Sequence, residues 1–195
     1  PYIKRKKTSD QQNQEDRERY QTCYASVPGA IAAPTAGLHF TPEVLEALRE
    51  RGTRVFELTL HVGLGTFSAV EDSDLRKHRM HSEHFQISEA VLNDLLEMKS
   101  EGKPIIAVGT TVVRVLESLA LENYQRHSGW TDIFIYPPYE FRLVDGMLTN
   151  FHLPNSTLMM LVSAFCGRTN LLRAYREAVQ ERYRFFSYGD CMLIL

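Results

Sequence analysis

The chain has 195 residues, and its 44% hydrophobic and 24% charged residues are the composition of an ordinary globular protein that can bury a sizeable core. A formal net charge of −2 carries no information about nucleic acid, so only local clusters of charge bear on such a partner. No apolar run approaches the roughly 18 residues that span a bilayer and the three cysteines are scattered, so we expect a reduced, cytoplasmic protein.

The first 22 residues form a polar segment that we expect to lie apart from an α/β domain over residues 23–195. The segment carries one dense basic cluster, which consists of Lys4, Arg5, Lys6 and Lys7. Most such clusters are solvated surface, and contact with RNA is the alternative. The chain starts on Pro1 rather than Met, so we expect the natural chain to extend upstream.

Apolar residues at helical spacing predict five helices, at residues 42–51, 88–100, 112–121, 157–167 and 170–183. The first follows the expected N-cap Thr41 and ends at Gly52. Ser88, Ser156 and Asn170 are the expected N-caps of later helices. Arg114 and Glu117 lie about one turn apart in the third helix and would form a surface ion pair.

β-branched, aromatic or continuous apolar segments predict five strands, at residues 54–63, 103–108, 131–138, 147–154 and 191–195. The last, "CMLIL", has the composition of a buried strand. Strands and helices alternate along much of the chain, which predicts an α/β fold with a parallel or mixed sheet.

Loops that follow strands are the expected place for a ligand, since α/β sheets bind ligands beyond the carboxyl ends of their strands. The candidate loops are "GLGTF", "GTT", "NFHLPNST" and "SYGD", together with "APTAG" at a helix entrance. Thr110 and Thr111 open a helix and could hold a carboxylate or phosphate. Gly63, Gly65 and Thr66 could cradle an anion, although such a turn is usually only a turn.

Three histidines at strand ends or in loops are candidates for a general base: His39, His61 and His152. An imidazole titrates near neutral pH, which suits that task. The alternative for each is a structural histidine bonded to a loop carbonyl.

Histidines also occur at a spacing of three, at His78, His81 and His84. Histidines one turn apart can share a metal ion, but this stretch matches no known ligand pattern. We expect no metal, and a metal-dependent hydrolase is kept as an alternative.

Seven separate blocks, taken together, resemble one family. They are "YQTCYASVPGAIAAPTAGLHFT", "ELTLHVGLGTF", "MHSEHFQI", "AVGTTVVRVLES", "DIFIYPPYEF", "LTNFHLPNSTLMMLVSAF" and "YRFFSYGDCMLI". The chain resembles the S-adenosylmethionine:tRNA ribosyltransferase-isomerase family over residues 1–195, in colinear order. It corresponds to the C-terminal part of that family, whose members carry a long N-terminal segment.

The resemblance implies an enzyme of queuosine biosynthesis. Family members transfer and isomerise the ribosyl group of S-adenosylmethionine onto 7-aminomethyl-7-deazaguanine at the tRNA wobble position, giving epoxyqueuosine and releasing adenine and methionine. The partners implied are that tRNA and S-adenosylmethionine, with no metal and no membrane, and we expect a monomer. A non-catalytic tRNA-binding fragment is a further alternative.

The resemblance also implies a fold similar to a barrel-like α/β domain with a mixed sheet, the family's small inserted β-barrel domain lying largely outside this chain. It points to His39 or His61 for proton transfer next to the sulfonium, with Asp190 orienting or stabilising it. The residues expected around S-adenosylmethionine are Gly37, Gly63, Gly65, Thr66, Thr110 and Thr111. The residues expected toward tRNA phosphates are Lys4, Arg5, Lys6, Lys7, Arg114 and Arg184.

Overall fold

A computed structural model describes residues 19–63 and 78–195 of the chain. The helices are η1 (Thr35–His39, 3₁₀), α2 (Pro42–Glu50), α3 (Glu89–Ser100), α4 (Thr110–Leu121), α5 (Thr157–Cys166) and α6 (Arg168–Gln180). The strands are β1 (Thr59–His61), β2 (Glu83–Gln86), β3 (Ile106–Val108), β4 (Ser128–Thr131), β5 (Gly146–Asn150) and β6 (Cys191–Ile194). The mixed α/β class predicted from the sequence is confirmed.

The strands form two separate three-stranded sheets rather than one. In the first, the order is β1-β2-β4 and all pairs are antiparallel. In the second, the order is β3-β5-β6, with β3 parallel and β6 antiparallel to β5. The parallel pair brings the carboxyl ends of β3 and β5 to the same edge, which is where α/β folds bind ligands.

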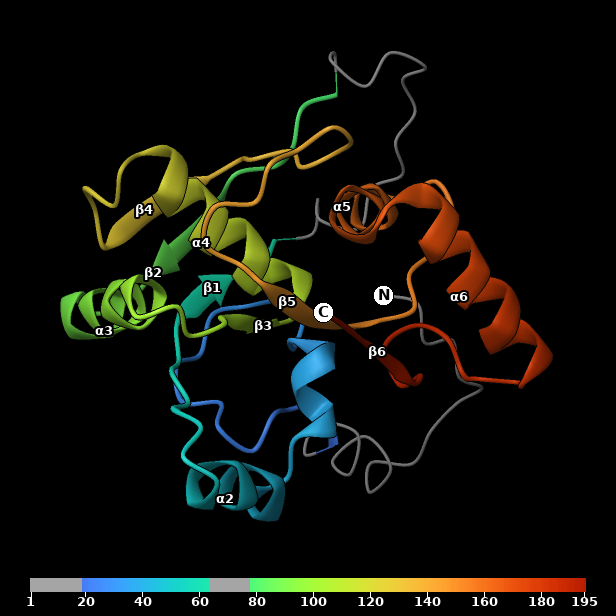
Figure 1. The fold of residues 1–195 in the computed structure, drawn as a ribbon, viewed down its shortest axis with the longest axis horizontal. Coiled ribbons are helices and arrows are strands. Elements are labelled where there is room, and N and C mark those ends of the chain that lie inside the picture. The colour runs from blue at the N-terminus through green and yellow to red at the C-terminus, as the bar shows by residue number, and fades with distance from the viewer. Residues whose placement is uncertain (1–18, 64–77) are drawn as a thin grey trace.

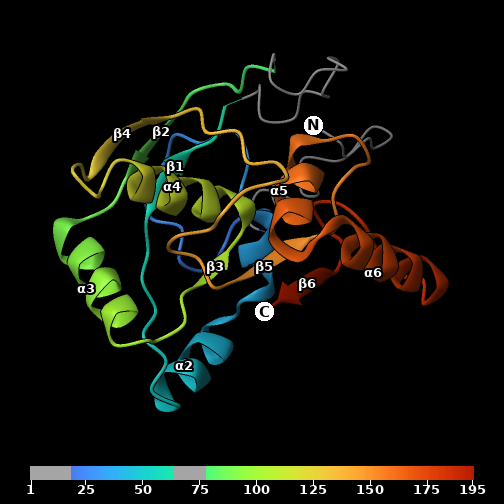
Figure 2. The same cartoon turned by 45° about the horizontal axis from the view of Figure 1, so that its top comes forward.

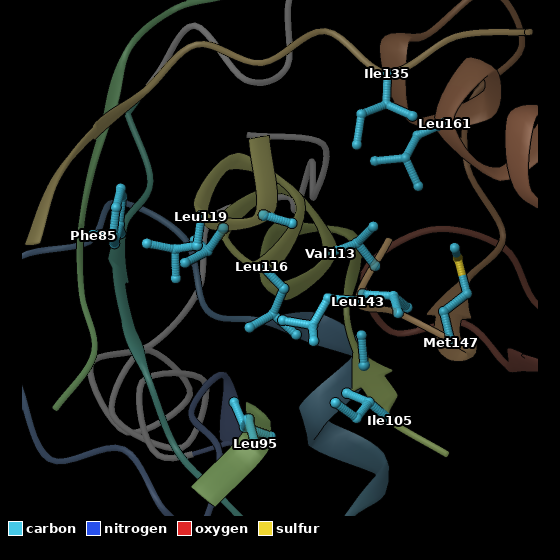
Figure 3. Packing of buried hydrophobic residues seen from close by; sticks show 14 of the residues in the cluster. Phe85, Leu95, Ile105, Val113, Leu116, Leu119, Ile135, Leu143, Met147 and Leu161 are labelled. Atoms are coloured by element: carbon cyan, nitrogen blue, oxygen red, sulfur yellow. The ribbon is translucent and has the colours of Figure 1, made fainter. Parts of the chain in front are cut away.

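Helix α4 lies at the centre of the molecule and contacts strands of both sheets (Figures 1 and 2). Its side chains Val113, Leu116 and Leu119 are fully buried between Phe85 of β2 and Met147 of β5 (Figure 3). Full burial of one such side chain stabilises the fold by about 1.5–3 kcal/mol. The core is therefore built around this one helix, while α3 and α6 lie at opposite ends of the molecule (Figure 1).

Three predicted helix caps are confirmed. The side-chain oxygens of Thr41, Ser88 and Ser156 each accept a hydrogen bond from a backbone N–H in the first turn of α2, α3 and α5. The prediction of Asn170 as a cap is wrong, because α6 begins at Arg168, directly after Gly167. Gly167 has a φ of 81°, which lets the chain turn from α5 straight into α6.

The strands are shorter than predicted, one strand is less buried than expected, and β2 was not predicted. Segment 103–108 is a strand only at Ile106–Val108, and segment 147–154 only within Gly146–Asn150. In segment 54–63 only Thr59–His61 pair in a sheet, and in segment 131–138 only Thr131 does. Their common neighbour β2 pairs through three residues with β1 and through four with β4, which limits the length of both. Strand β6 pairs with β5 on one side only, so it is an edge strand. Leu193 is consequently 59% exposed, which corrects the expectation of a buried strand.

Candidate active site

A cleft of about 190 Å³ opens where loops far apart in the sequence meet. Its walls come from residues 32–36, 109–111 and 149–156, with further contributions from Val62 and from residues 186–187. Four of the segments singled out in the sequence, "APTAG", "GTT", "NFHLPNST" and "SYGD", thus contribute to one cavity.

The cleft lies beyond the parallel strands β3 and β5. Strand β3 leads through Gly109 directly into α4, and Gly109 has a φ of 95°, which favours glycine. Strand β5 ends at Asn150, and η1 contacts this strand. The short connection at Gly109 and the parallel pairing therefore bring the start of α4 beside Asn150.

Asn150 is buried and joins three segments at the cleft. The Thr35 hydroxyl donates to Asn150 Oδ1 at 2.9 Å, and Asn150 Nδ2 donates to the Asp190 carbonyl at 3.5 Å. These two bonds fix the orientation of the amide, so Nδ2 also donates to His39 Nε2, at 3.4 Å. Asn150 thereby holds η1 and the turn before β6 against the end of β5.

His152 is the histidine in the cleft wall. Its Nε2 lies 2.8 Å from the Thr149 hydroxyl, and its backbone N–H donates to Tyr175 Oη of α6 at 2.6 Å. Burial lowers the pKa of His152 to about 4, so the ring is neutral at pH 7. A neutral, weakly basic ring fits a structural role in the loop better than that of a general base.

Comparison with known proteins identifies the family. A family model described as queuosine biosynthesis protein matches residues 1–194. The chain belongs to this family.

Relatives in this queuosine biosynthesis family are about half identical to the chain. It is 55% identical over 196 residues to the S-adenosylmethionine:tRNA ribosyltransferase-isomerase of Natranaerobius thermophilus, covering 100% of the chain and 55% of the relative. It is 56% identical over 199 residues to the protein of the same name from Treponema denticola, covering 100% of the chain and 56% of the relative. The chain spans about half the length of these relatives.

A solved structure is similar as well. The crystal structure of S-adenosylmethionine tRNA ribosyltransferase from Thermotoga maritima superposes with a TM-score of 0.68 at 48% sequence identity. The match covers 82% of this chain and 51% of that one. The fold of this chain is thus one that is found in this family.

His39 and Asp190, two residues expected at the site, both contact Asn150 Nδ2, but neither is among the residues that line the cleft. His39 is exposed at the end of η1 and contacts Asn150. The Asp190 carboxylate accepts hydrogen bonds from the Arg184 backbone N–H at 2.6 Å and from its guanidinium at 3.1 Å. These bonds lower the pKa of Asp190, so it stays ionised. The carboxylate is bonded to Arg184 and is not among the residues that line the cleft.

His61 contacts a different set of groups. Its ring stacks on His84 at 6.0 Å, and the ring of His84 meets the edge of Trp130 at 5.3 Å. A side chain at Gly29 would overlap the His61 ring, with its Cβ 2.7 Å from Nδ1. His61 therefore faces neighbours on the antiparallel sheet, and only the next residue, Val62, lines the cleft.

Of the glycines and threonines expected around S-adenosylmethionine, only Thr110 and Thr111 are found in the cleft wall, within the part of the chain that the structure describes. Gly37 does not line the cleft, because it packs so closely on Tyr24 that a Cβ would lie 2.0 Å from the phenol oxygen. Gly63 has open space around it. Gly65, Thr66 and the basic cluster at Lys4, Arg5, Lys6 and Lys7 lie outside the described residues.

The expectation that Arg114 faces tRNA is wrong. Its side chain is buried, forms an ion pair with Glu83 and donates from Nε to the Ile133 carbonyl at 3.3 Å. Glu117 is buried too, so the two do not form a surface pair. No local signal in the sequence indicated this, because Arg114, Glu117 and Ser118 share one face of α4, which is the pattern of an amphipathic helix with a solvent-exposed side. Arg184, by contrast, is 76% exposed.

The described residues contain no metal-ligating cluster. No group of three or more His, Cys, Asp or Glu in residues 19–63 and 78–195 could hold a metal ion. His78 instead contacts the Phe134 ring at 4.9 Å. Within the same ranges, no helix is long and apolar enough to span a bilayer.

Sequence reasoning gave no individual role to three polar residues of the cleft, Thr35, Thr149 and Asn150, although Thr35 and Asn150 lie in the candidate loops "APTAG" and "NFHLPNST". The available signal was a pair of polar residues, "TN", directly after the apolar start of β5. Buried polar side chains at the end of a strand require partners. Asn150 bonds to Thr35, 115 positions away, and to Asp190, 40 positions away, while Thr149 lies within hydrogen-bond distance of His152, three positions on.

Proposed function

We propose that this member of the queuosine biosynthesis family acts as an S-adenosylmethionine:tRNA ribosyltransferase-isomerase. It would transfer and isomerise the ribosyl group of S-adenosylmethionine onto 7-aminomethyl-7-deazaguanine at the tRNA wobble position. The products are epoxyqueuosine-tRNA, adenine and methionine. The observation that carries the proposal is the single cleft formed by the family's loops at the end of the parallel strands.

The chemistry of the cleft fits a nucleoside. Its walls are largely apolar, with Ala32, Val62 and Pro154 among them, and a few polar groups converge at Thr110 and Asn150. Such a mixture is typical of small-molecule sites, where a small number of polar groups fix orientation. The Phe186 ring also lines the cleft and offers a surface on which an adenine can stack.

His39 is the base that we propose for removing the proton next to the sulfonium. Asn150 Nδ2 donates to its Nε2 at 3.4 Å, which places the imidazole beside the end of β5. Asp190 contacts the same Asn150 amide through its backbone carbonyl. In this proposal Asp190 stabilises the sulfonium by its negative charge and not by contact, because its carboxylate is bonded to Arg184 and does not line the cleft.

The remaining family properties are part of the same proposal. Residues 23–195 belong to the barrel-like catalytic domain, and the inserted β-barrel domain lies largely outside this chain. Gly63, Gly65 and Thr66 lie near S-adenosylmethionine, while Arg184 and the basic cluster at residues 4–7 face tRNA phosphates. The protein acts as a cytoplasmic monomer and uses no metal.

The test is to incubate the chain with S-adenosylmethionine and tRNA carrying 7-aminomethyl-7-deazaguanine, and to follow adenine by chromatography and the modified base by mass spectrometry. We expect both products to appear in equal amounts. A parallel calorimetric titration with S-adenosylmethionine examines the cleft alone. Absence of heat, together with salt-sensitive tRNA binding, would overturn the proposal in favour of a non-catalytic RNA-binding role.

A further inference from the structure

Phe186 has a side chain that does not suit its backbone conformation. Its φ is 70°, in the left-handed region, which is strained for a bulky residue and which glycine or asparagine adopts more easily. Burial in the core does not explain the residue either, because Phe186 is 41% exposed. The stability of the fold therefore gives no reason for a phenylalanine at this position.

The turn that carries Phe186 is held by backbone hydrogen bonds on both sides of the residue. The Phe186 N–H donates at 3.1 Å to the carbonyl of Phe151, the residue directly after β5, and the Phe186 carbonyl accepts from the Gly189 N–H at 3.0 Å. The Asp190 N–H donates to the Arg184 carbonyl at 2.8 Å. A Cβ at Gly189 would lie 2.4 Å from the Arg184 carbonyl oxygen, so this close packing requires glycine. The conformation of Phe186 is thus fixed by its neighbours.

Phe186 is presented to the cleft, whereas the ring before it anchors the turn. The centroid of the Phe185 ring lies 4.9 Å from that of Phe151 and 5.7 Å from that of Tyr175 in α6. Phe186 instead lines the cleft. The cleft wall contains two further Phe or Tyr residues, Tyr20 and Phe151, and both are less exposed than Phe186. Phe186 therefore offers the cleft its most exposed aromatic side chain.

The surroundings of this ring fit the face of a neutral, flat group. The cleft residues that the structure describes include no Lys, Arg, Asp or Glu, and many of them are apolar. Contact between aromatic faces is the interaction that an exposed phenyl ring offers in such a wall. A nucleobase has such a face, and stacking on one aromatic side chain strengthens the binding of a base by roughly 5- to 150-fold.

We propose that Phe186 is the main determinant of affinity for the adenine base of S-adenosylmethionine, and that the turn 184–190 holds its ring in place for stacking despite the backbone strain. This inference rests on the proposed function and adds to it the residue that selects the nucleoside end of the ligand. Adenine is the one aromatic group of S-adenosylmethionine, so the exposed ring has a defined partner in that ligand. Glycine or asparagine would suit the backbone at this position better, and the phenylalanine serves binding instead.

Calorimetry with S-adenosylmethionine on the intact chain measures the contribution of the ring. Phe186→Ala should weaken binding by roughly 5- to 150-fold, the range for loss of one stacked base. Phe186→Tyr keeps an aromatic face and should bind within about twofold of wild type. Tyr183→Ala is the matched control, because Tyr183 is 49% exposed and precedes the same turn but does not line the cleft. Its affinity should equal that of wild type.

Urea unfolding separates this role from a structural one. Phe186→Gly should unfold at a urea concentration about 0.3–1 M higher than Phe186→Ala, because glycine adopts the left-handed conformation without strain. Both variants should bind S-adenosylmethionine equally weakly, since both lack the ring. Arg182 is the control, because it is exposed, has a φ of 59° and does not line the cleft. Arg182→Gly and Arg182→Ala should show the same order of stability with the affinity of wild type.

A tryptophan at position 186 reports the contact directly. The chain has one tryptophan, Trp130, which does not line the cleft. In the double variant Phe186→Trp/Trp130→Phe, S-adenosylmethionine should quench the tryptophan emission, because the adenine stacks on the indole. S-methylmethionine keeps the methionine part and the sulfonium but lacks adenine, and it should leave the emission unchanged. Unchanged emission with S-adenosylmethionine bound would contradict the inference.

The outcomes separate this inference from the proposed function. If wild type and Phe186→Ala bind S-adenosylmethionine equally well, adenine does not stack on Phe186, and the proposed function still stands. If Phe186→Ala weakens tRNA binding in a filter assay and leaves S-adenosylmethionine binding unchanged, the ring contacts a base of the tRNA, and the inference is wrong. If the wild-type chain does not bind S-adenosylmethionine, the proposed function itself fails, and the inference fails with it.

Discussion

Arg114 of α4 and Glu83 of β2 form an ion pair inside the core, with side chains 2% and 0% exposed. The pair joins the central helix to the middle strand of the antiparallel sheet. Removal of one partner of a buried pair leaves an uncompensated charge, which is far more costly than removal of both. The pair is therefore a structural feature of the helix that also supplies Thr110 and Thr111 to the cleft.

Glu83→Gln should lower the free energy of unfolding by about 3–5 kcal/mol, because the Arg114 guanidinium loses its counter-charge in the core. Urea unfolding followed by circular dichroism measures the change. The double variant Glu83→Leu/Arg114→Met should be more stable than Glu83→Gln. Glu97→Gln, at an exposed position of α3, is the control and should change the stability by less than about 0.5 kcal/mol. Equal stability of Glu83→Gln and wild type would contradict the argument.

Glu117→Gln should destabilise the fold for a different reason. The Glu117 carboxylate accepts backbone N–H bonds from residues 142–144, at 2.9 to 3.0 Å, and one from the Tyr139 hydroxyl at 3.2 Å. An amide replaces one acceptor oxygen by a donor, which leaves buried N–H groups unpaired at a cost of about 1–3 kcal/mol. The free energy of unfolding should fall by this amount, whereas Glu177→Gln on the exposed face of α6 should have almost no effect.

The local parts of the fold could be predicted from sequence because their causes are local. A Thr or Ser ahead of a helical pattern satisfies N–H groups only three residues on, as Thr41, Ser88 and Ser156 do. Strand pairing has no such local cause, since β2 pairs with β1 and β4 through residues 23 to 48 positions away. The division into two sheets therefore could not be predicted from the pattern alone.

The features of the candidate site also separate into those with a local cause, which could be predicted, and those with a distant cause, which could not. The loops could be identified because strand ends that lead into helices are visible in the sequence, and Gly109 marks one of them. The role of Arg114 could not, since its partner Glu83 lies 31 residues away on another element. Likewise, nothing local indicates that Thr35 bonds to Asn150, 115 residues away.

The stability should depend on pH through His152. Its pKa is about 4 in the folded state and 6.5 in a model peptide, so the unfolded chain binds more protons between these values. Stability is then greatest above pH 6.5 and falls as the pH drops toward 4, by about 3 kcal/mol at most from this group. Urea unfolding at several pH values should show a shallower fall for His152→Gln than for wild type. His127→Gln, at an exposed histidine, should follow the wild-type curve.

The two candidate bases differ in position, so their variants should differ in rate. His39 contacts Asn150, which lines the cleft, whereas His61 stacks on His84 of the antiparallel sheet, and neither histidine lines the cleft itself. A positioned base contributes about 10²–10⁴ in rate, so His39→Gln should lower kcat for adenine release by a factor of this order, with little change in KM for S-adenosylmethionine. His61→Gln should lower kcat less than tenfold. Near wild-type turnover in His39→Gln, with the loss appearing in His61→Gln instead, would move the proton transfer to His61.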